Sequence, residues 1–326
     1  MPKSRKWFKT GKVVEVRSAD QILRTLDENG ALDGLPFMPE MLEFCGKSFR
    51  VSRRVEKTCV EWATLAYDIR EFENDDVVFL EDLRCPGTSH DGCQRACMLF
   101  WKTRWLSPAG RDRAPDPAGP DRGEAPEARL RTRTAAGGYL CQSTELKKAT
   151  IGMSRTRRLS KCVSVVASGD VTLPKMIALI VLPVFRKIIG RRFSPVAGIL
   201  ARTPTENLDL RAGELVEVKS VGEIAGTLDP ASKNRGLVYD KGLGRFSGRR
   251  FRVRNRLDSM ILEPTGEMIR PKATVVLDGP TCLCNNVLGG CPRREVIFWR
   301  EIWLKRADRL SPESGPNPPD RPGETR

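Results

Sequence analysis

Four cysteines in the first third of the chain have the residue type and the number that a structural zinc ion needs. Cys59, Cys85, Cys93 and Cys97 are separated by 25, 7 and 3 residues. Four thiolates complete the tetrahedral shell of Zn²⁺ and leave no open position, so such a site supports folding rather than catalysis. We therefore predict a structural zinc site, with His90 within reach as a substitute ligand. The alternative is that these thiols are small buried apolar side chains.

A row of arginines lies in the segment SGRRFRVRNR (residues 247–256). Residues two apart on a β-strand point to the same side. The arginines with that spacing are Arg250, Arg252, Arg254 and Arg256. Because guanidinium groups neutralise phosphate charge, we predict a nucleic-acid-binding face here, with an ordinary solvated strand face as the alternative.

The excess positive charge is concentrated in the middle of the chain. Of the formal net charge of +15, residues 108–208 contribute +10, with 18 Lys and Arg against 8 Asp and Glu. Such a balance suits an anionic partner, which we expect to be nucleic acid, an anionic membrane surface or an acidic protein. The apolar segment 173–193 has basic flanks and predicts either a helix that docks on a protein or one that lies in an anionic membrane interface. Its run from Met176 to Phe185 is too short for a transmembrane span.

Motifs for catalysis are few. The chain has a single histidine, and it contains no Gly-rich phosphate loop, no Gly-x-Ser-x-Gly and no His-Glu-x-x-His sequence. Cys45 and Cys141 remain as nucleophiles for a thiol-dependent enzyme, although neither has an evident base. We expect a binding or scaffold protein rather than an enzyme, with thiol-dependent catalysis as an alternative.

These residues lie in a unit that occurs twice. A shift of 202 residues aligns Gly11–Arg54 with Gly213–Arg256 at 17 identical positions of 44, and the motif FWKTRWL returns as FWREIWL. A duplication of this size predicts two domains rather than a short repeat array. The predicted segments are a first repeat at 9–107, a disordered linker at 108–138, a helical middle segment at 139–200, a second repeat at 211–306 and a disordered tail at 307–326.

The second repeat departs from the first at the cysteines. Met260 stands where the first repeat has Cys59, and Glu295 stands where it has Cys97. Cys282, Cys284 and Cys291 could still ligate a metal together with Glu295. We expect instead a degenerate copy that needs no metal.

Each repeat reads as a series of short strands. KVVEV, SFRVSRR, DDVVFL and MLFWKTRWL are rich in β-branched and aromatic residues. Ser18 with Gln21, and Ser220 with Glu223, form the capping-box pattern that begins a short helix. In the last strand Trp101 and Trp105 share one face, which favours core packing over a surface for stacking bases.

The segments GKVVEV and CGKSFRV, with glycines at strand bends, resemble SH3-like barrels, especially the KOW-type barrels of translation and transcription proteins. The stretch GLPFMPEM (Gly34–Met41) before FCG resembles uncharacterised bacterial proteins with such tandem repeats, and it predicts either a binding loop or a turn. The expected fold is mainly β with α, made of two duplicated small SH3-like barrels and a helical middle segment. Since no secretory signal is visible at the start of the chain, we expect a cytoplasmic protein with reduced cysteines.

Overall fold

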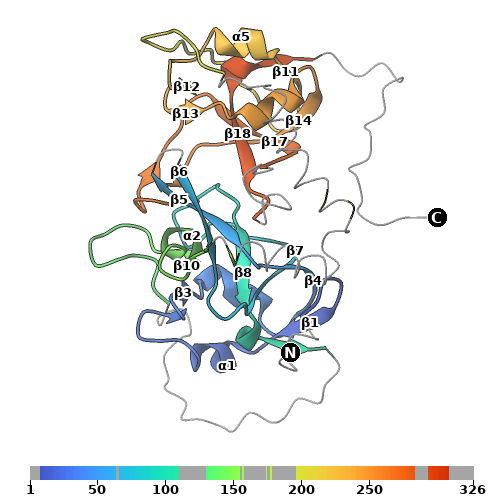
Figure 1. The fold of residues 1–326 in the computed structure, drawn as a ribbon, viewed down its shortest axis with the longest axis vertical. Coiled ribbons are helices and arrows are strands. Elements are labelled where there is room, and N and C mark those ends of the chain that lie inside the picture. Colours follow the sequence, from blue (N-terminus) through green and yellow to red (C-terminus); the bar gives the residue numbers. More distant parts are fainter. Residues whose placement is uncertain are drawn as a thin grey trace, which may run out of the picture. The chain divides into compact units, whose positions relative to one another are not determined.

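The computed structural model describes residues 8–63, 66–109, 130–154, 156–157, 174, 177, 196–282 and 293–307. These residues form mainly β-structure with a few short helices (Figure 1). The chain divides into two compact units. Unit 1 comprises Met1–Ser194, Leu257–Lys272 and Thr281–Ile297, and unit 2 comprises Pro195–Arg256, Ala273–Pro280 and Phe298–Arg326.

The first repeat builds a five-stranded antiparallel sheet in the order β8-β7-β4-β1-β9. Its strands are β1 (Val13–Val16), β4 (Ser48–Arg54), β7 (Val77–Arg84), β8 (Met98–Lys102) and β9 (Leu106–Pro108). The alternation of KVVEV places Val14 and Val16 in the core, where both are fully buried. The strands predicted from the sequence therefore form one layer around that core.

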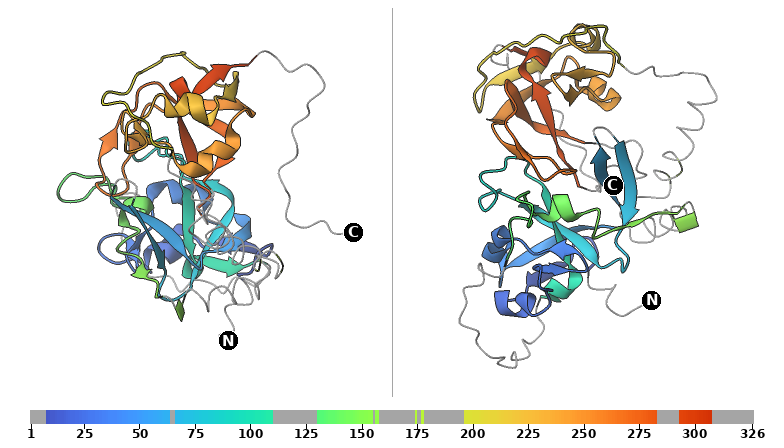
Figure 2. Two further views of the ribbon diagram at one scale, coloured as in Figure 1. Left: turned by 45° about the horizontal axis from the view of Figure 1, so that its top comes forward. Right: turned by 90° about the vertical axis from the view of Figure 1, so that its left-hand side faces the viewer.

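Connectivity forces this sheet to curl. Its two edge strands, β8 and β9, are joined by the three-residue 3₁₀ helix η3 (Thr103–Trp105). The edges of a flat five-stranded sheet lie about 19 Å apart, since neighbouring strands are spaced by about 4.8 Å. The four Cα steps from Lys102 to Leu106 span at most about 14 Å. The sheet is therefore rolled into a half-barrel (Figure 2).

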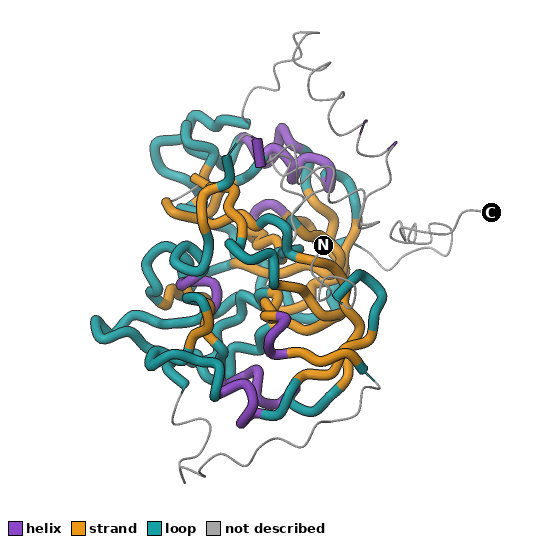
Figure 3. The backbone as a smooth tube through the Cα atoms, turned by 60° about the horizontal axis from the view of Figure 1, so that its bottom comes forward, coloured by secondary structure: helices purple, strands orange, loops and turns teal. Residues whose placement is uncertain are grey.

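The second repeat builds the same sheet in the order β18-β17-β14-β11-β19. Its strands are β11 (Leu215–Val218), β14 (Arg250–Arg256), β17 (Thr274–Thr281), β18 (Val296–Arg300) and β19 (Leu304–Arg306), with the 3₁₀ helix η6 (Glu301–Trp303). Val14 pairs with Phe49, and Val216 pairs with Phe251, so the register is preserved. The prediction of a mainly β chain is confirmed, since strands dominate the regular structure (Figure 3), and each of the two copies forms a curled sheet.

Each copy carries one short helix after its first strand. These are α1 (Ala19–Leu23) and α5 (Val221–Ala225). Both predicted capping boxes are present, at Ser18 with Gln21 and at Ser220 with Glu223. The remaining elements are β2 (Ala31–Leu32), β3 (Leu35–Pro36), η2 (Pro39–Phe44), β5 (Thr58–Ala63), β6 (Ala66–Glu71), α2 (Gln142–Glu145), β10 (Ile151–Gly152), β12 (Lys233–Asn234), β13 (Leu237–Val238), η5 (Lys241–Phe246), β15 (Met260–Ile261) and β16 (Met268–Ile269).

The two compact units do not coincide with the two sequence repeats. The hairpin β15–β16 belongs to the second repeat in sequence, yet it is part of unit 1. The strand β10, which follows the predicted linker, pairs with β6 in the same unit. Unit 1 is therefore assembled from the first repeat, a piece of the middle segment and two pieces of the second repeat.

Paired tryptophans form the centre of each sheet's core. Trp101, Trp105, Trp299 and Trp303 are fully buried. The Nε1 atom of Trp105 donates to Thr25 Oγ1 at 3.1 Å, and that of Trp303 donates to Thr227 Oγ1 at 3.1 Å. The expectation of one strand carrying both tryptophans is wrong, because the strand ends at Lys102 and the second tryptophan lies on the 3₁₀ helix. Core packing is what the structure shows for all four indoles.

Several predicted segments fall largely outside the described residues. These are most of the linker at 108–138, the tail beyond residue 307, and all of 173–193 except Pro174 and Ile177. Leu130, inside the predicted linker, is buried in the core of unit 1. The described part of 139–200 holds the four-residue helix α2 and the strand β10, so the helical middle segment is not confirmed. Among the described residues, no helix is long and apolar enough to cross a membrane.

Candidate metal centre and basic face

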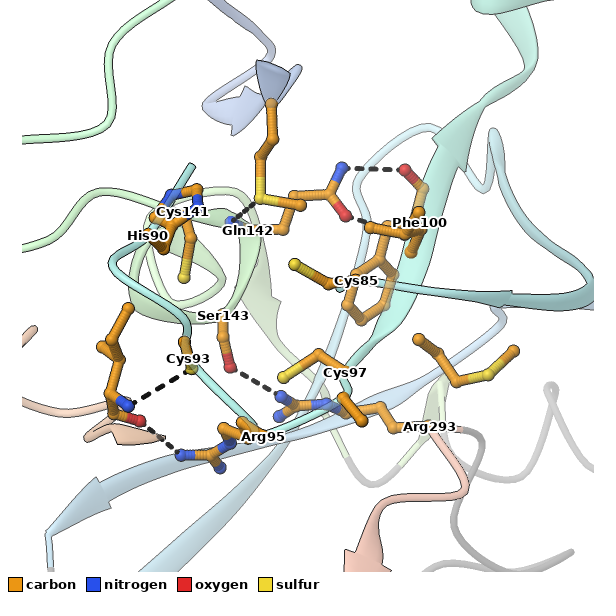
Figure 4. A pocket seen from close by; sticks show the side chains of 15 residues that line it. Cys85, His90, Cys93, Arg95, Cys97, Phe100, Cys141, Gln142, Ser143 and Arg293 are labelled. Carbon is orange, nitrogen blue, oxygen red and sulfur yellow. Dashed lines mark hydrogen bonds between the residues drawn. The ribbon is translucent and has the colours of Figure 1, made fainter. Parts of the chain in front are cut away.

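A small pocket in unit 1 brings cysteines together from three places in the chain. Cys85, Cys93, Cys97 and Cys141 line it, and Figure 4 shows all four around the same space. The cavity is about 30 Å³, which is room for an ion or a water but not for an organic substrate. Three of the four predicted zinc ligands are thus brought together, and Cys141 joins them.

The turn between Cys85 and Cys93 is held by backbone hydrogen bonds. Gly87 accepts from the N–H groups of His90 and Gly92 at 3.1 and 3.0 Å. Its φ is +72°, and a Cβ there would lie 2.0 Å from the Cys93 carbonyl oxygen. Glycine is therefore required at this position. The Cys85 N–H donates to the Cys97 carbonyl at 2.8 Å, which places these two cysteines opposite each other just beyond the paired strands β7 and β8.

Cys141 reaches the pocket because it precedes helix α2. Gln142, the next residue, fixes this helix against the sheet, since its side-chain amide bonds both the N–H and the C=O of Phe100, at 2.8 and 2.9 Å. Its Nε2 also donates to the Pro36 carbonyl at 3.0 Å. The segment Gly34–Met41 therefore forms part of the support for the pocket, which is a role that its local sequence did not reveal.

Cys59 does not line the pocket. It is buried on β5, and its carbonyl accepts from Arg293 Nη1 at 3.0 Å. In the part of the chain that the structure describes, no three His, Cys, Asp or Glu side chains are grouped closely enough, as they stand, to hold a metal ion. Zinc at the four predicted cysteines stays a prediction.

His90 is fully engaged by two acceptors. Its Nδ1 lies 2.5 Å from Glu40 Oε1, and its Nε2 lies 3.0 Å from the Leu140 carbonyl oxygen. Burial alone would lower the pKa of His90, but the hydrogen bond and charge of Glu40 outweigh burial and raise it. For Glu40, burial would raise the pKa, and the partnership with His90 lowers it instead. The pair is therefore an imidazolium and a carboxylate. His90 then has no lone pair with which to ligate a metal or to accept the proton of a nucleophile.

Neither thiol considered as a nucleophile is activated. Burial raises the pKa of Cys45 to about 11 and that of Cys141 to about 12. Burial likewise raises the pKa of Cys85 and of Cys97. A catalytic cysteine needs the opposite shift, toward thiolate at neutral pH. The described surroundings of these thiols keep them protonated.

A buried charge network joins the pocket to the β15–β16 hairpin. Glu263 Oε2 accepts from Arg293 Nη2 at 2.8 Å, from Arg95 Nη2 at 3.2 Å and from Ser143 Oγ at 2.8 Å. Burial would raise the pKa of Glu263, but the charges of Arg293 and Arg95 lower it. Nothing in the local spacing of these residues marked them in the sequence, because their partners lie up to 234 residues away.

The candidate metal ligands of the second repeat are described only in part. Cys284 and Cys291 lie outside the described residues. Glu295 forms an ion pair with Arg293 at 2.8 Å and with Arg95 at 3.4 Å. Its carboxylate is therefore already part of the charge network of unit 1.

In unit 2 the predicted arginine row lies on β14. Arg250 and Arg254 are about half exposed, with side-chain exposures of 45% and 47%, and Arg252 is also exposed. The register of β14 against β17 shifts between Val253 and Asn255, which breaks the alternation. Beyond this bulge Arg256 turns to the buried Glu301 at 3.1 Å. Three of the four arginines therefore share the exposed face.

Acidic neighbours cancel only part of this charge. Arg250 pairs with Glu217 at 3.2 Å, but Glu217 also pairs with Lys305 at 2.9 Å. The Lys305 bond, then the bond from Arg250, holds the pKa of Glu217 below its usual value. Arg252 Nη1 donates to the Gly213 carbonyl, and it forms no ion pair with a described residue.

Comparisons with known proteins find no relative of this chain. No protein-family model matches the chain, and neither the curated proteins nor the solved structures contain a match.

Proposed function

We propose that this protein is a non-catalytic binding or scaffold protein that engages an anionic partner through the exposed face of β14. Among anionic partners, nucleic acid is the one that we favour. Its two curled sheets would be SH3-like barrels. The strand order and the 3₁₀ helix between the last two strands of each copy support this, since five short strands rolled around one core are typical of such barrels. Zinc in the first repeat would stiffen that copy.

The single observation behind the proposal is the excess of positive charge on β14. Arg250, Arg252 and Arg254 are exposed on one strand. Glu217 is shared between Arg250 and Lys305, and the Arg254–Asp278 contact is long, at 4.0 Å. Exposed ion pairs of this kind hold each other weakly, so a phosphate can displace a carboxylate at little free-energy cost.

The first repeat provides a matched reference surface. At the positions of Arg250, Arg252 and Arg254 it has Ser48, Arg50 and Ser52. Arg50 donates to the Gly11 carbonyl just as Arg252 donates to the Gly213 carbonyl. Serine is therefore compatible with this strand geometry, and R250S/R254S converts the second face into the first without disturbing the sheet.

The experiment measures binding of a single-stranded oligonucleotide by fluorescence anisotropy at several salt concentrations. If Arg250 and Arg254 each contact a phosphate, R250S/R254S reduces the magnitude of the slope of log K against log salt by about 1.4, at about 0.7 per contact. The control, Arg50→Ser in the first repeat, leaves the slope unchanged. An unchanged slope and affinity in R250S/R254S, and in a variant with all three arginines reversed to Glu, would overturn the proposal.

A further inference from the structure

The four thiols of the pocket come from segments that are far apart in the chain. Cys85 follows β7, Cys93 and Cys97 precede β8, and Cys141 precedes α2. Their side chains meet around one cavity of about 30 Å³ (Figure 4). Four thiols around a space of ionic size is the donor set of a tetrahedral sulfur site.

A backbone N–H group points at one of these sulfurs. Ile261 N–H donates to Cys93 Sγ at 3.4 Å. Burial raises the pKa of Cys85 and of Cys141, while the backbone of Gly87 acts on Cys85, and that of Ser143 and Thr144 on Cys141, in the direction that favours the thiolate. Backbone groups placed in this way orient metal ligands and favour the negative sulfur.

We infer that Cys85, Cys93, Cys97 and Cys141 form a structural zinc site, in which Cys141 takes the place that the sequence assigned to Cys59. The inference rests on the zinc part of the proposed function and changes its ligands. It is independent of anion binding at β14. A closed set of four sulfurs suits Zn²⁺ in a structural role and leaves no position for a substrate.

Other ligands nearby are already committed. Both ring nitrogens of His90 face acceptors, and Glu263 and Glu295 are bound by the guanidinium groups of Arg95 and Arg293. The cysteines are not committed in this way, but as they stand they are not grouped closely enough to hold a metal ion. Zinc binding would therefore have to turn each thiol about its one rotatable side-chain bond toward the cavity centre, to Zn–S distances of about 2.3 Å.

Zinc at this site would join the 139–153 segment to the first repeat. Cys141 is 44 residues beyond Cys97, and residues 110–129 between them lie outside the described part. A metal that ligates Cys141 therefore closes a long loop and fixes α2, whose Gln142 holds the β8 backbone at Phe100.

The test is the metal content of the full chain, purified under reducing conditions and without a tag. We expect about one zinc ion per chain, as a closed four-cysteine site binds one ion. Cys141→Ser loses the zinc, whereas Cys59→Ser and Cys45→Ser keep it. Because Cys141→Ser could fail to fold, Cys141→His provides a second variant that retains a ligand and keeps the zinc. Reconstituted with Co²⁺, Cys141→His loses about a quarter of the sulfur-to-cobalt absorption, because three thiolates remain of four.

Two results would overturn the inference, and they differ in what else they affect. Zinc that persists in Cys141→Ser but is lost in Cys59→Ser would restore the original ligand set and leave the zinc part of the proposed function intact. Absence of zinc from the wild-type chain, with no uptake on addition of the metal alone, would remove both. Neither result bears on oligonucleotide binding at β14, which is measured separately.

Discussion

The two copies share the strand order and register of one sheet but differ in what surrounds it. Val14 and Val216 have equivalent partners, and both β4 and β14 have a bulge at the same place. In the first copy the segment between β7 and β8 lines a thiol pocket, while its counterpart in the second copy lies mostly outside the described residues. The repeated residues therefore specify the sheet, and the residues that differ between the copies set the chemistry around it.

A buried cation shows the same divergence on a smaller scale. Lys102 at the end of β8 is bound by Asp33 at 2.8 Å and by Asp76 at 3.1 Å. Arg300, its counterpart on β18, donates to the carbonyls of Asn234 and Arg235 and to Thr274 Oγ1. Burial, and then the charge of Arg235, lowers the pKa of Arg300. The position keeps a cation, but its partners changed from carboxylates to neutral oxygens.

The largest effect is expected where the copies agree most closely. Trp105→Ala and Trp303→Ala should each lower the free energy of unfolding of their own unit by about 3–5 kcal/mol, since each removes a fully buried indole. Calorimetry of the two variants measures both losses. Thr25→Val is the control that keeps the indole and removes the hydroxyl, which accepts from Trp105 Nε1 and donates to the Ile22 carbonyl, at about 1 kcal/mol per hydrogen bond. If the two losses differ by more than about 2 kcal/mol, the two tryptophans are packed differently, although the strand registers of the two copies are the same.

Replacing the buried cation should lower the free energy of unfolding by different amounts in the two copies. Lys102→Met leaves two carboxylates facing an apolar side chain, and we expect a loss near the low end of the range of about 3–5 kcal/mol for breaking a buried pair, because Asp33 is half exposed. Arg300→Met leaves neutral acceptors and should cost about 1–3 kcal/mol. Urea unfolding of both variants tests the order. A larger loss for Arg300→Met would contradict the comparison.

Alkaline pH should weaken unit 1 through His90. Its pKa is raised in the folded state, so its stabilisation is complete below the unfolded value of 6.5 and is lost as pH rises through the folded pKa. For Glu40 the folded pKa is lowered, so its contribution is present above 4.5 and is lost as pH falls through the folded value.

His90→Gln measures this contribution. The variant should lose about 1.5–3 kcal/mol near neutral pH, as expected for a hydrogen bond to a charged group. It should also flatten the decline in unfolding free energy above neutral pH. The chain has no other histidine to confuse the result. A wild-type stability that rises between pH 6.5 and 9, with no change in the slope for His90→Gln, would argue against an imidazolium at this position.

The smallest effect on stability is expected at the exposed face of β14. Arg254→Ser removes a contact of 4.0 Å between two half-exposed side chains, and it should change the free energy of unfolding by less than about 1 kcal/mol. The same change should weaken oligonucleotide binding in low salt. Urea titration and anisotropy on one protein preparation compare the two. A substantial stability loss would mean that this arginine supports the fold rather than a ligand.

Local patterns predicted the sheets well. KVVEV alternates as β1 does, and the capping boxes at Ser18 and Ser220 begin helices where the pattern placed them. The 3₁₀ helix at Thr103 was missed, because strand propensity in MLFWKTRWL does not reveal where the edge strands must meet. The place of Cys141 in the pocket and the charge network around Glu263 were missed for a different reason. Their importance depends on partners far along the chain, and no local spacing records such a contact.

The hairpin that completes unit 1 has a consequence for how the protein is made. Arg95 emerges from the ribosome early, but Glu295, one of its carboxylate partners, follows 200 residues later. At about 5–20 residues per second, that interval is about 10–40 s. Until then, the N-terminal sheet exists without Glu295, and for most of that interval it also lacks β15 and Glu263. Chains that terminate early should therefore carry an unfinished first unit, which makes them targets for proteases even though that sheet has been fully translated.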